Sequence, residues 1–538
     1  MRSLTLAFAL HSCLAFSSLF GKEDASPGET HWEFQADGRV MATAAMDAER
    51  IYFGTASRSA SAPTSDLYCL DRETGTEVWS QAFPNWLQAC PVITNTRVFI
   101  GCDDTKLYCL DKQTGEELWQ VNTFGRIDST PCVDMPGNCY FGSRDRFLYA
   151  VDQSGQVLWS RFLTQGVASS PLLNEREGRL YVADLSNTIY AFTLSGEELW
   201  RYKPRQGGIG GVRLRIYSSP TIDDEGVLYV GSGDKNLYAV NRHTGQLFWR
   251  EPTGGVVDSS PVISGDEHLY VANREGVLFK YRIDLLTEDR EVWRNDCIGQ
   301  VFYGSPTIDA ANNIYICGAP PITDPEAEEP QTQLSYIDRV SGQILWSERY
   351  SGYTDATPIL DDEGNVYFGT ASGAFMKVNG AGRGLAETSW PTFRGQVSGA
   401  GRYEETYRDW LIRFGIPPEF ASTNRDSDED GFCDFEEFVL GAHPKDPTSR
   451  PSRMVGQITP LDDAAQFSFE LLKGLRTTYR VEASTNLQAW LPTGISRDRF
   501  NYEDEEDRWR VKVPLGPPAS SQELYYRVRW EQEATQKP

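Results

Sequence analysis

The sequence predicts a mainly β protein whose largest part is an eight-bladed β-propeller, and three observations carry that prediction. The phrase "LYCLDRETGTEVW" (67–79) returns in seven further close or loose copies. A small residue followed by Pro precedes each copy from the second onward. Each unit is about 40 residues long and has room for four short strands, which is the repeat of a propeller blade. The units close on Trp79, Trp119, Trp159, Trp200, Trp249, Trp293, Trp346 and Trp390.

Four strands, A to D, are expected in each unit because apolar, β-branched and aromatic residues alternate between turn signals. In one unit they are "SPTID" (219–223), "LYVGS" (228–232), "LYAVN" (237–241) and "LFW" (247–249). The D-x-x-T-G sequence between strands C and D predicts a tight turn, in which Asp caps the backbone and Gly supplies a positive φ. We expect the Trp that follows to cover the seam between neighbouring sheets.

The closure of the ring has two interpretations. The segment "HWEFQ" (31–35) resembles a lone D strand that could complete the eighth blade beside strands from 358–378. The segment "SWPTFRG" (389–395) competes for the same place. Nothing in the residues decides between them.

The "LYALD..TG..LW" type of repeat resembles the PQQ-like (quinoprotein dehydrogenase-like) propellers, over residues 31–400. That resemblance implies either a dehydrogenase, with pyrroloquinoline quinone and Ca²⁺ over the central channel, or a quinone-free scaffold. The lipoprotein propeller of the outer-membrane β-barrel assembly machine is such a scaffold. The dehydrogenases stack the quinone on two adjacent disulfide-bonded cysteines and carry long insertions, whereas this chain has no Cys-Cys pair and compact blades.

We therefore expect a scaffold that binds a protein or a small ligand, and not an enzyme. The alternatives are a PQQ-dependent alcohol or sugar dehydrogenase and an outer-membrane protein assembly scaffold. The five histidines of the chain have no spacing that suggests a catalytic pair.

Charge and the N-terminus bound the partners and the location. The 538-residue chain has a formal net charge of −25, which argues against nucleic acid and anionic membrane as partners. Residues 1–21 resemble a signal peptide, and no later stretch is long and apolar enough to span a bilayer. A secreted or periplasmic protein is expected, with lipidation of Cys13 in "LHSC" as an alternative to ordinary cleavage.

Export permits disulfides. Two hairpin pairings are conceivable, Cys132 with Cys139 and Cys90 with Cys102. The alternative is that these cysteines are small buried apolar residues, as free Cys often is.

One face of the propeller is expected to carry the function. The three longest insertions, 57–66, 203–215 and 319–333, all belong to B–C or D–A loops, which lie on the same face. Loops that vary over a rigid scaffold usually carry binding sites. Strand A is innermost and begins at this face, so the residue three before each Pro should ring the channel mouth. The candidates for ligand binding there are Asp128, Tyr217, Asp258, Tyr303 and Asp355.

Two interpretations of that ring stand. Like charges held close together would raise some pKa values or recruit a cation, which predicts a polar pocket. In the dehydrogenase alternative the three acids would supply a metal ligand or a base. Otherwise the five residues are solvated loop ends.

Residues 403–448 predict a helix followed by a calcium loop. The segment "DSDEDGFCDFEE" (426–437) matches D-x-D-x-D-G-x5-E, the EF-hand spacing that brings hard oxygens together around Ca²⁺. An acidic turn without metal is the alternative. The expected ligands are Asp426, Asp428, Asp430, Phe432 through its carbonyl, Asp434 and Glu437.

The C-terminal part, residues 455–531, contains four segments that alternate like half-buried strands. They predict a small β-sandwich, similar in size to an immunoglobulin domain. The sequence thus predicts an exported propeller stabilised by calcium, with a helical calcium-loop segment and a C-terminal sandwich.

Overall fold

The computed structural model describes residues 26–403 with interruptions, and strands between 457 and 531. The interruptions are 60–63, 176, 205–213, 224–225, 285–288, 302, 321–329, 382–383, 387, 389–390, 397 and 400. The regular structure of the described residues is entirely β. Among them, no helix is long and apolar enough to cross a membrane.

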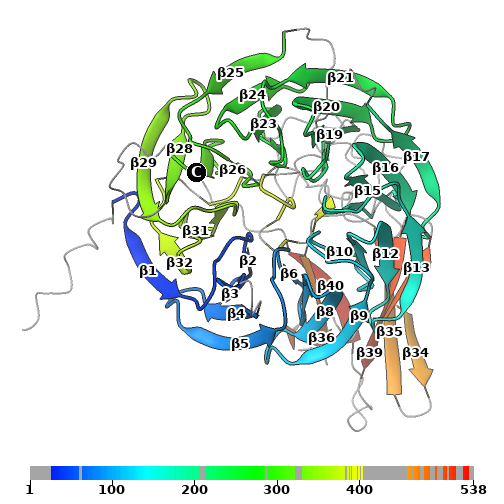
Figure 1. Cartoon of the computed structure of the whole chain (residues 1–538). Helices are drawn as coiled ribbons and strands as arrows, with labels where there is room; N and C mark the ends of the chain where they lie inside the picture. Colours follow the sequence, from blue (N-terminus) through cyan, green and yellow to red (C-terminus); the bar gives the residue numbers. More distant parts are fainter. Residues whose placement is uncertain are drawn as a thin grey trace, which may run out of the picture.

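Eight antiparallel sheets stand around a central axis, with strand A innermost and strand D at the rim (Figure 1). The alternation of apolar and turn residues in the repeat thus yields one blade per unit. Blade one consists of β2 (Ala45–Met46), β3 (Arg50–Gly54), β4 (Ser65–Asp71) and β5 (Glu77–Phe83), and blade two of β6 (Val92–Ile93), β7 (Arg97–Gly101), β8 (Lys106–Asp111) and β9 (Glu117–Asn122). Blade three consists of β10 (Cys132–Val133), β11 (Cys139–Gly142), β12 (Phe147–Val151) and β13 (Val157–Phe162), and blade four of β14 (Leu172–Asn174), β15 (Arg179–Asp184), β16 (Thr188–Thr193) and β17 (Glu198–Tyr202).

The second half of the ring repeats the pattern. Blade five consists of β18 (Thr221–Ile222), β19 (Val227–Gly231), β20 (Asn236–Asn241) and β21 (Leu247–Pro252), and blade six of β22 (Val262–Ile263), β23 (His268–Ala272), β24 (Leu278–Arg282) and β25 (Glu291–Asn295). Blade seven consists of β26 (Thr307–Ile308), β27 (Ile314–Gly318), β28 (Gln331–Ile337) and β29 (Ile344–Ser351), and blade eight of β30 (Ile359–Leu360), β31 (Val366–Gly369), β32 (Ala374–Val378) and β1 (Thr30–Gln35).

The eighth blade is completed by the N-terminal strand. β1 pairs antiparallel with β32, for example Glu33 with Met376, so the first interpretation of the closure is the correct one. The competing segment does not form the clasp. Its described residues run inside the ring, where the carbonyl of Pro391 accepts a hydrogen bond from the backbone N–H of Ile308, at 2.9 Å (Figure 1). Trp32 in β1 therefore takes the place expected for Trp390, which lies outside the described residues.

In six of the blades, the described Trp on the outermost strand joins its blade to the next one through its indole N–H, whereas the indole N–H groups of Trp249 and Trp346 have no partner. The indole N–H of Trp200 donates to the carbonyl of Arg242 at 2.9 Å, across the seam between blades four and five. The same ring lies against Gly245, whose φ is +69°. A Cβ at that glycine would meet the indole at 2.5 Å, so this turn requires Gly both for its backbone and for the close approach. The repeated T-G and Trp thus form one contact between adjacent blades.

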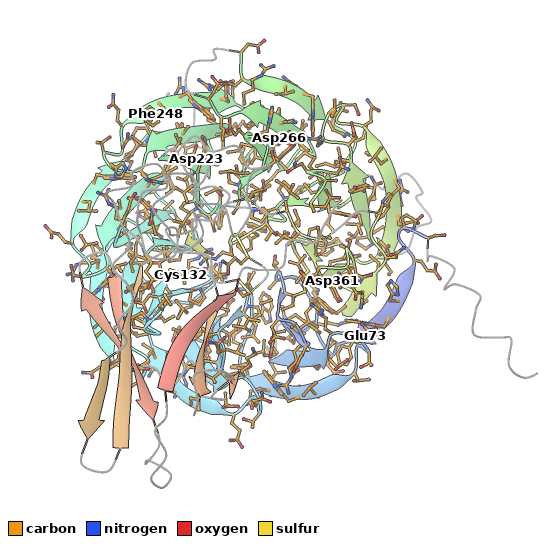
Figure 2. All side chains as sticks on the ribbon, turned by 180° about the vertical axis from the view of Figure 1, so that it is seen from behind. Glu73, Cys132, Asp223, Phe248, Asp266 and Asp361 are labelled. Carbon is orange, nitrogen blue, oxygen red and sulfur yellow. The ribbon has the colours of Figure 1, made fainter. Side chains whose placement is uncertain are left out.

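The eight cysteines described are free, and seven of them are buried. Cys132 and Cys139 cannot bond, because they belong to adjacent pairs of the β10–β11 register and point to opposite faces of the sheet. One packs into the hydrophobic cluster shared with blade four and the other into the cluster shared with blade two. Figure 2 shows Cys132 toward the centre and Phe248 at the rim, with side chains filling the space between the sheets.

Beyond the ring, β33 (Arg402–Tyr403) adds in parallel to β14. A helix from 403 was expected, and Tyr403 is instead in a strand, while the rest of 404–456 lies outside the described residues. The C-terminal part forms two small antiparallel sheets, β34-β35-β39-β38 and β37-β36-β40. Their strands are β34 (Gln457–Leu461), β35 (Ala464–Leu472), β36 (Thr478–Ser484), β37 (Leu491–Pro492), β38 (Asn501–Glu505), β39 (Arg508–Leu515) and β40 (Tyr525–Glu531).

We predict that Trp200→Ala lowers the free energy of unfolding by about 3 kcal/mol, because it removes a buried aromatic ring and leaves a cavity at the seam. Leu199→Ala on the same strand is the matched control. Leu199 is 41% exposed, so its loss should change stability by less than about 0.5 kcal/mol. Urea denaturation followed by tryptophan fluorescence measures both, and equal effects would contradict the assigned role of the indole.

Candidate functional site

A ring of hydrogen bonds surrounds the channel at the start of the innermost strands. In blades two to eight, the backbone N–H of the residue before Pro donates to the hydroxyl of its counterpart in the next blade. Seven such steps measure 2.9–3.0 Å, from Cys90 through Thr130, Ser170, Ser219, Ser260, Ser305 and Thr357 to Thr43. At the eighth step Thr43 faces the thiol of Cys90. This ring explains why the repeat places a small hydroxyl residue before Pro.

Immediately outside this ring lies a cup with a volume of about 210 Å³. Its walls include the residue three before each Pro in blades two to eight, and Met41 at the matching place in blade one. All five predicted ligand-binding residues, Asp128, Tyr217, Asp258, Tyr303 and Asp355, are therefore brought together around one cavity. Phe393, from the segment inside the ring, also lines it.

The cup opens on the face where the three insertions belong. Residues 57–66 lie mainly between β3 and β4, residues 203–215 between β17 and β18, and residues 319–333 mainly between β27 and β28. Within these insertions, residues 60–63, 205–213 and 321–329 lie outside the described residues.

Two of the three carboxylates in the cup are held by arginines from B–C loops. Arg144 binds both oxygens of Asp128, with its Nε 2.9 Å from each of them. The Nε of Arg274 binds Oδ2 of Asp258 at 2.5 Å. The guanidinium groups also lie against tyrosine rings, Arg144 at 5.4 Å from the centre of Tyr217 and Arg274 at 5.5 Å from that of Tyr303. Each Asp–Arg–Tyr set thus fixes one side of the mouth.

The two tyrosines meet each other across the mouth. Their ring centres are 5.6 Å apart and their planes make an angle of 70°, an edge-to-face contact. The hydroxyl of Tyr217 accepts a hydrogen bond from Arg215 at 3.1 Å. Tyr303 remains 43% exposed, so it presents an accessible aromatic surface at the opening.

Burial is the main influence on the pKa values of Asp258 and Asp355. It raises the pKa of Asp258 to about 6, although Arg274 opposes the shift. It also raises the pKa of Asp355 to about 6, and Arg274 again opposes the shift, from further away. Oδ1 of each residue is buried and has no hydrogen-bond partner. Desolvation, and not the repulsion between carboxylates that the sequence suggested, is the main cause of these shifts.

The sequence analysis missed the arginines that complete the cup, whereas its rule of the third residue before Pro had already placed Gln88 at the mouth. Arg126 lies 3.7 Å from Asp103 and 3.6 Å from Asp128, and Gln88 donates to Asp103 at 2.6 Å. A signal was present, because Arg144 and Arg274 occupy the same place in their repeats, just after strand B. Comparing blades at that place would have found both.

The lining residues do not match pyrroloquinoline quinone. That planar molecule carries three carboxylates, whereas three carboxylates and two guanidinium groups line the cup. The thiol that lines the cup, Cys90, is free, and the two tyrosine rings do not form a flat stacking surface. The candidate calcium ligands from Asp426 to Glu437 lie outside the described residues. No cluster of three or more His, Cys, Asp or Glu within the described residues could hold a metal ion.

Comparison with known proteins agrees with this architecture. The family profile described as outer membrane protein assembly factor BamB matches residues 24–123 and 103–348, more than half of the chain. The chain belongs to this family. The BamB of Shewanella oneidensis is 24% identical over 271 residues, which are 39% of this chain and 67% of that protein. A second relative is the tetrathionate hydrolase of Acidithiobacillus ferrooxidans, 24% identical over 334 residues, 54% of this chain and 63% of that enzyme.

The similarity of this chain to solved structures shows only that the fold is shared. The BamB of Moraxella catarrhalis aligns with a TM-score of 0.52 at 15% identity, covering 65% of this chain and 99% of that one. Sqt1 of Saccharomyces cerevisiae aligns with a TM-score of 0.52 at 12% identity, covering 66% and 99%. This chain of the BamB family therefore has a β-propeller of the PQQ-like type with further residues on its C-terminal side.

We predict that Asp355→Asn stabilises the protein at pH 8 and has no effect near pH 4. The pKa of Asp355 is about 6 in the folded protein, against about 3.9 for an unfolded chain. Between these values the folded state holds a proton that the unfolded state has lost, so stability falls as the pH rises through this window. Removing the acid should therefore raise the free energy of unfolding at pH 8 by about 1–3 kcal/mol.

The matched control is Asp128→Asn, which leaves the half-buried Arg144 without its carboxylate and should destabilise the protein at pH 8. Urea denaturation at pH 4, 6 and 8 separates the two variants. A loss of stability in both at pH 8 would contradict an unpaired Asp355.

Proposed function

We propose that this protein is an exported scaffold, and that the face bearing the insertions binds a protein partner around the cup. The observation that supports this most directly is the cup itself. It gathers charged and aromatic side chains from the loops of several blades, on the same face as the longest insertions. Convergent polar groups in a largely preformed cavity are the usual mark of a binding site.

Binding is favoured over catalysis by the chemistry of the lining. No histidine lines the cup, and burial raises the pKa of the Cys90 thiol, so that thiol is a weak nucleophile. The Acidithiobacillus relative is named a tetrathionate hydrolase, and tetrathionate is a dianion. The three carboxylates that line the cup do not favour a dianion. The chain also spans only 63% of that enzyme.

The family name supports a more specific second candidate, in which the partner belongs to an outer-membrane protein assembly complex. The relative in Shewanella oneidensis has the same name, outer membrane protein assembly factor BamB. The signal-like residues 1–21 agree with export, and Cys13 would supply a lipid anchor in this alternative. The further residues after the propeller would then add a function that the family profile does not cover.

We predict that a photo-crosslinking amino acid at Tyr303 captures the partner in living cells, because this exposed side chain lies at the cup mouth. The matched control position is Glu116, which is exposed in a turn between β8 and β9 on the opposite face. Capture is expected from position 303 and not from 116. Equal capture, or capture from 116 alone, would show that the insertion-bearing face is not the binding face.

A structural Ca²⁺ at residues 426–437 is a further part of the proposal, supported by the spacing of the loop. We predict that the full-length protein binds one Ca²⁺ per chain in calorimetric titration. Glu437→Gln should weaken binding at least tenfold, because position twelve supplies two oxygens. Glu436→Gln, the neighbour outside the ligand spacing, should leave binding unchanged. Absence of calcium binding, or equal loss in both variants, would reduce this segment to an acidic turn.

A further inference from the structure

The Asp–Arg pairs of the cup follow a rule of register. Asp128 and Arg144 are 16 residues apart, and so are Asp258 and Arg274. In both blades the backbone N–H of the arginine donates to the carbonyl two residues before the aspartate, from Arg144 to Arg126 at 3.0 Å and from Arg274 to Val256 at 2.8 Å. The loop geometry thus places each guanidinium over the carboxylate of its own blade.

The eighth blade keeps this geometry and lacks the arginine. Asp355 lines the cup, and Ala371 stands at the matching place, with its backbone N–H 2.8 Å from the carbonyl of Tyr353. Asp355 consequently makes no ion pair with a described residue, and its Oδ1 has no hydrogen-bond partner. A buried carboxylate is costly unless it is paired, so this gap marks a place for a cation from outside.

Asp258, which lines the same cavity, has a second buried oxygen without a partner. The side chain of Asp258 is 1% exposed, and only its Oδ2 is bound by Arg274. Its Oδ1 has no partner. Two carboxylates in one cup thus each present an acceptor that the described residues leave unused.

Of the carboxylates around the cup, one has no arginine within ion-pair distance. Arg144 neutralises Asp128, Arg274 neutralises Asp258, and Arg126 lies 3.7 Å from Asp103. Asp355 remains. A divalent metal ion would need about six oxygen ligands, and no metal-binding cluster occurs among the described residues. A monovalent organic cation needs only one or two carboxylates, and an aromatic surface such as Tyr303 favours it further.

We propose that the cup binds an alkylammonium group, held by Asp355 and by the free oxygen of Asp258. This inference rests on the proposed binding function of the face and names the chemistry that the site recognises. The ammonium belongs either to a lysine side chain of a protein partner or to a free polyamine. A volume of about 210 Å³ accommodates a short alkyl chain and its ammonium group but not a folded loop.

The proposal includes a pH dependence. The groups that face Asp355 are Arg274 and Tyr303, while Arg58, further round the mouth, donates to the carbonyl of Ser372. Asp258 and Asp355 both have pKa values of about 6 without ligand. Protonation therefore removes the negative charges that would hold the ammonium as the pH falls below 6. Ammonium binding is accordingly strong at pH 8 and lost near pH 5, since a cation stabilises only the ionised carboxylates.

The test installs the missing arginine. In Ala371→Arg the side chain occupies the place that Arg144 and Arg274 have in their blades, so it should pair with Asp355 and exclude the ligand. Calorimetric titration at pH 8 uses 1,5-diaminopentane as the polyamine probe and an N-acetyl-lysine amide as the lysine probe. The N-acetyl-norleucine amide has a similar chain without the charge and serves as the ligand control.

Wild-type protein is expected to bind at least one ammonium probe and not the norleucine amide. Asp355→Asn should weaken binding at least tenfold, and Ala371→Arg should abolish it while raising the thermal midpoint at pH 8. The higher midpoint shows that the loss does not come from misfolding. Ala371→Met, which adds length without charge, should retain binding within about threefold. Tighter binding of the diamine favours a polyamine, and tighter binding of the lysine amide favours a partner side chain.

The proposal is overturned if wild type binds neither ammonium probe, or if Ala371→Arg and wild type bind equally. Cross-linking from position 303 in the Ala371→Arg background separates this failure from failure of the scaffold function. Retained capture of the partner by a wild-type protein that binds neither ammonium probe leaves the face as an interface and removes the ammonium site. Loss of capture in Ala371→Arg, with wild-type capture intact, supports both.

Discussion

The ring of hydrogen bonds around the channel is the constraint on which the rest of the propeller depends. Each blade presents a backbone N–H at the start of its innermost strand, and no partner for that group exists within its own sheet. The hydroxyl of the next blade satisfies it, in seven steps from Cys90 round to Thr43. A buried N–H without a partner would cost a few kcal/mol, so each hydroxyl fixes the position of its neighbour blade. The Trp–Gly contacts repeat the same link at the rim.

This ring also determines where function can be placed. Because the residue before Pro is committed to the ring, the residue three positions before Pro is carried to the channel mouth in each blade. Eight positions are thereby delivered to one cavity whatever side chains they bear, which in this chain range from Ala168 to Asp355. The scaffold supplies the geometry, and the sequence is free to choose the chemistry of the site.

The sequence was sufficient for the parts of the structure that repeat. The eight units, their strands, the face of the insertions and the five residues of the mouth all followed from the spacing of Trp and Pro. It was insufficient where a single, unrepeated contact decides, as in the choice between residues 31–35 and 389–395 for the clasp. That choice depends on pairing across the whole chain, such as Phe34 with Phe375, which no local pattern encodes. The arginines of the cup were overlooked because their partners lie a full hairpin away in sequence.

The segment that lost the competition for the clasp has a different structural task. Arg394 is 1% exposed and donates to the carbonyls of Pro131 and Pro171 at 2.8 and 2.6 Å, directly after two members of the hydroxyl ring. Its neighbour Phe393 lines the cup. Because these residues cross the channel, a ligand has to approach from the face with the insertions. A guanidinium buried without a described carboxylate partner is costly, and its two carbonyl contacts offset only part of that cost. At the cup mouth the unpaired group is instead a carboxylate, because Asp355 in blade eight lacks the arginine that Arg144 and Arg274 supply in blades three and six.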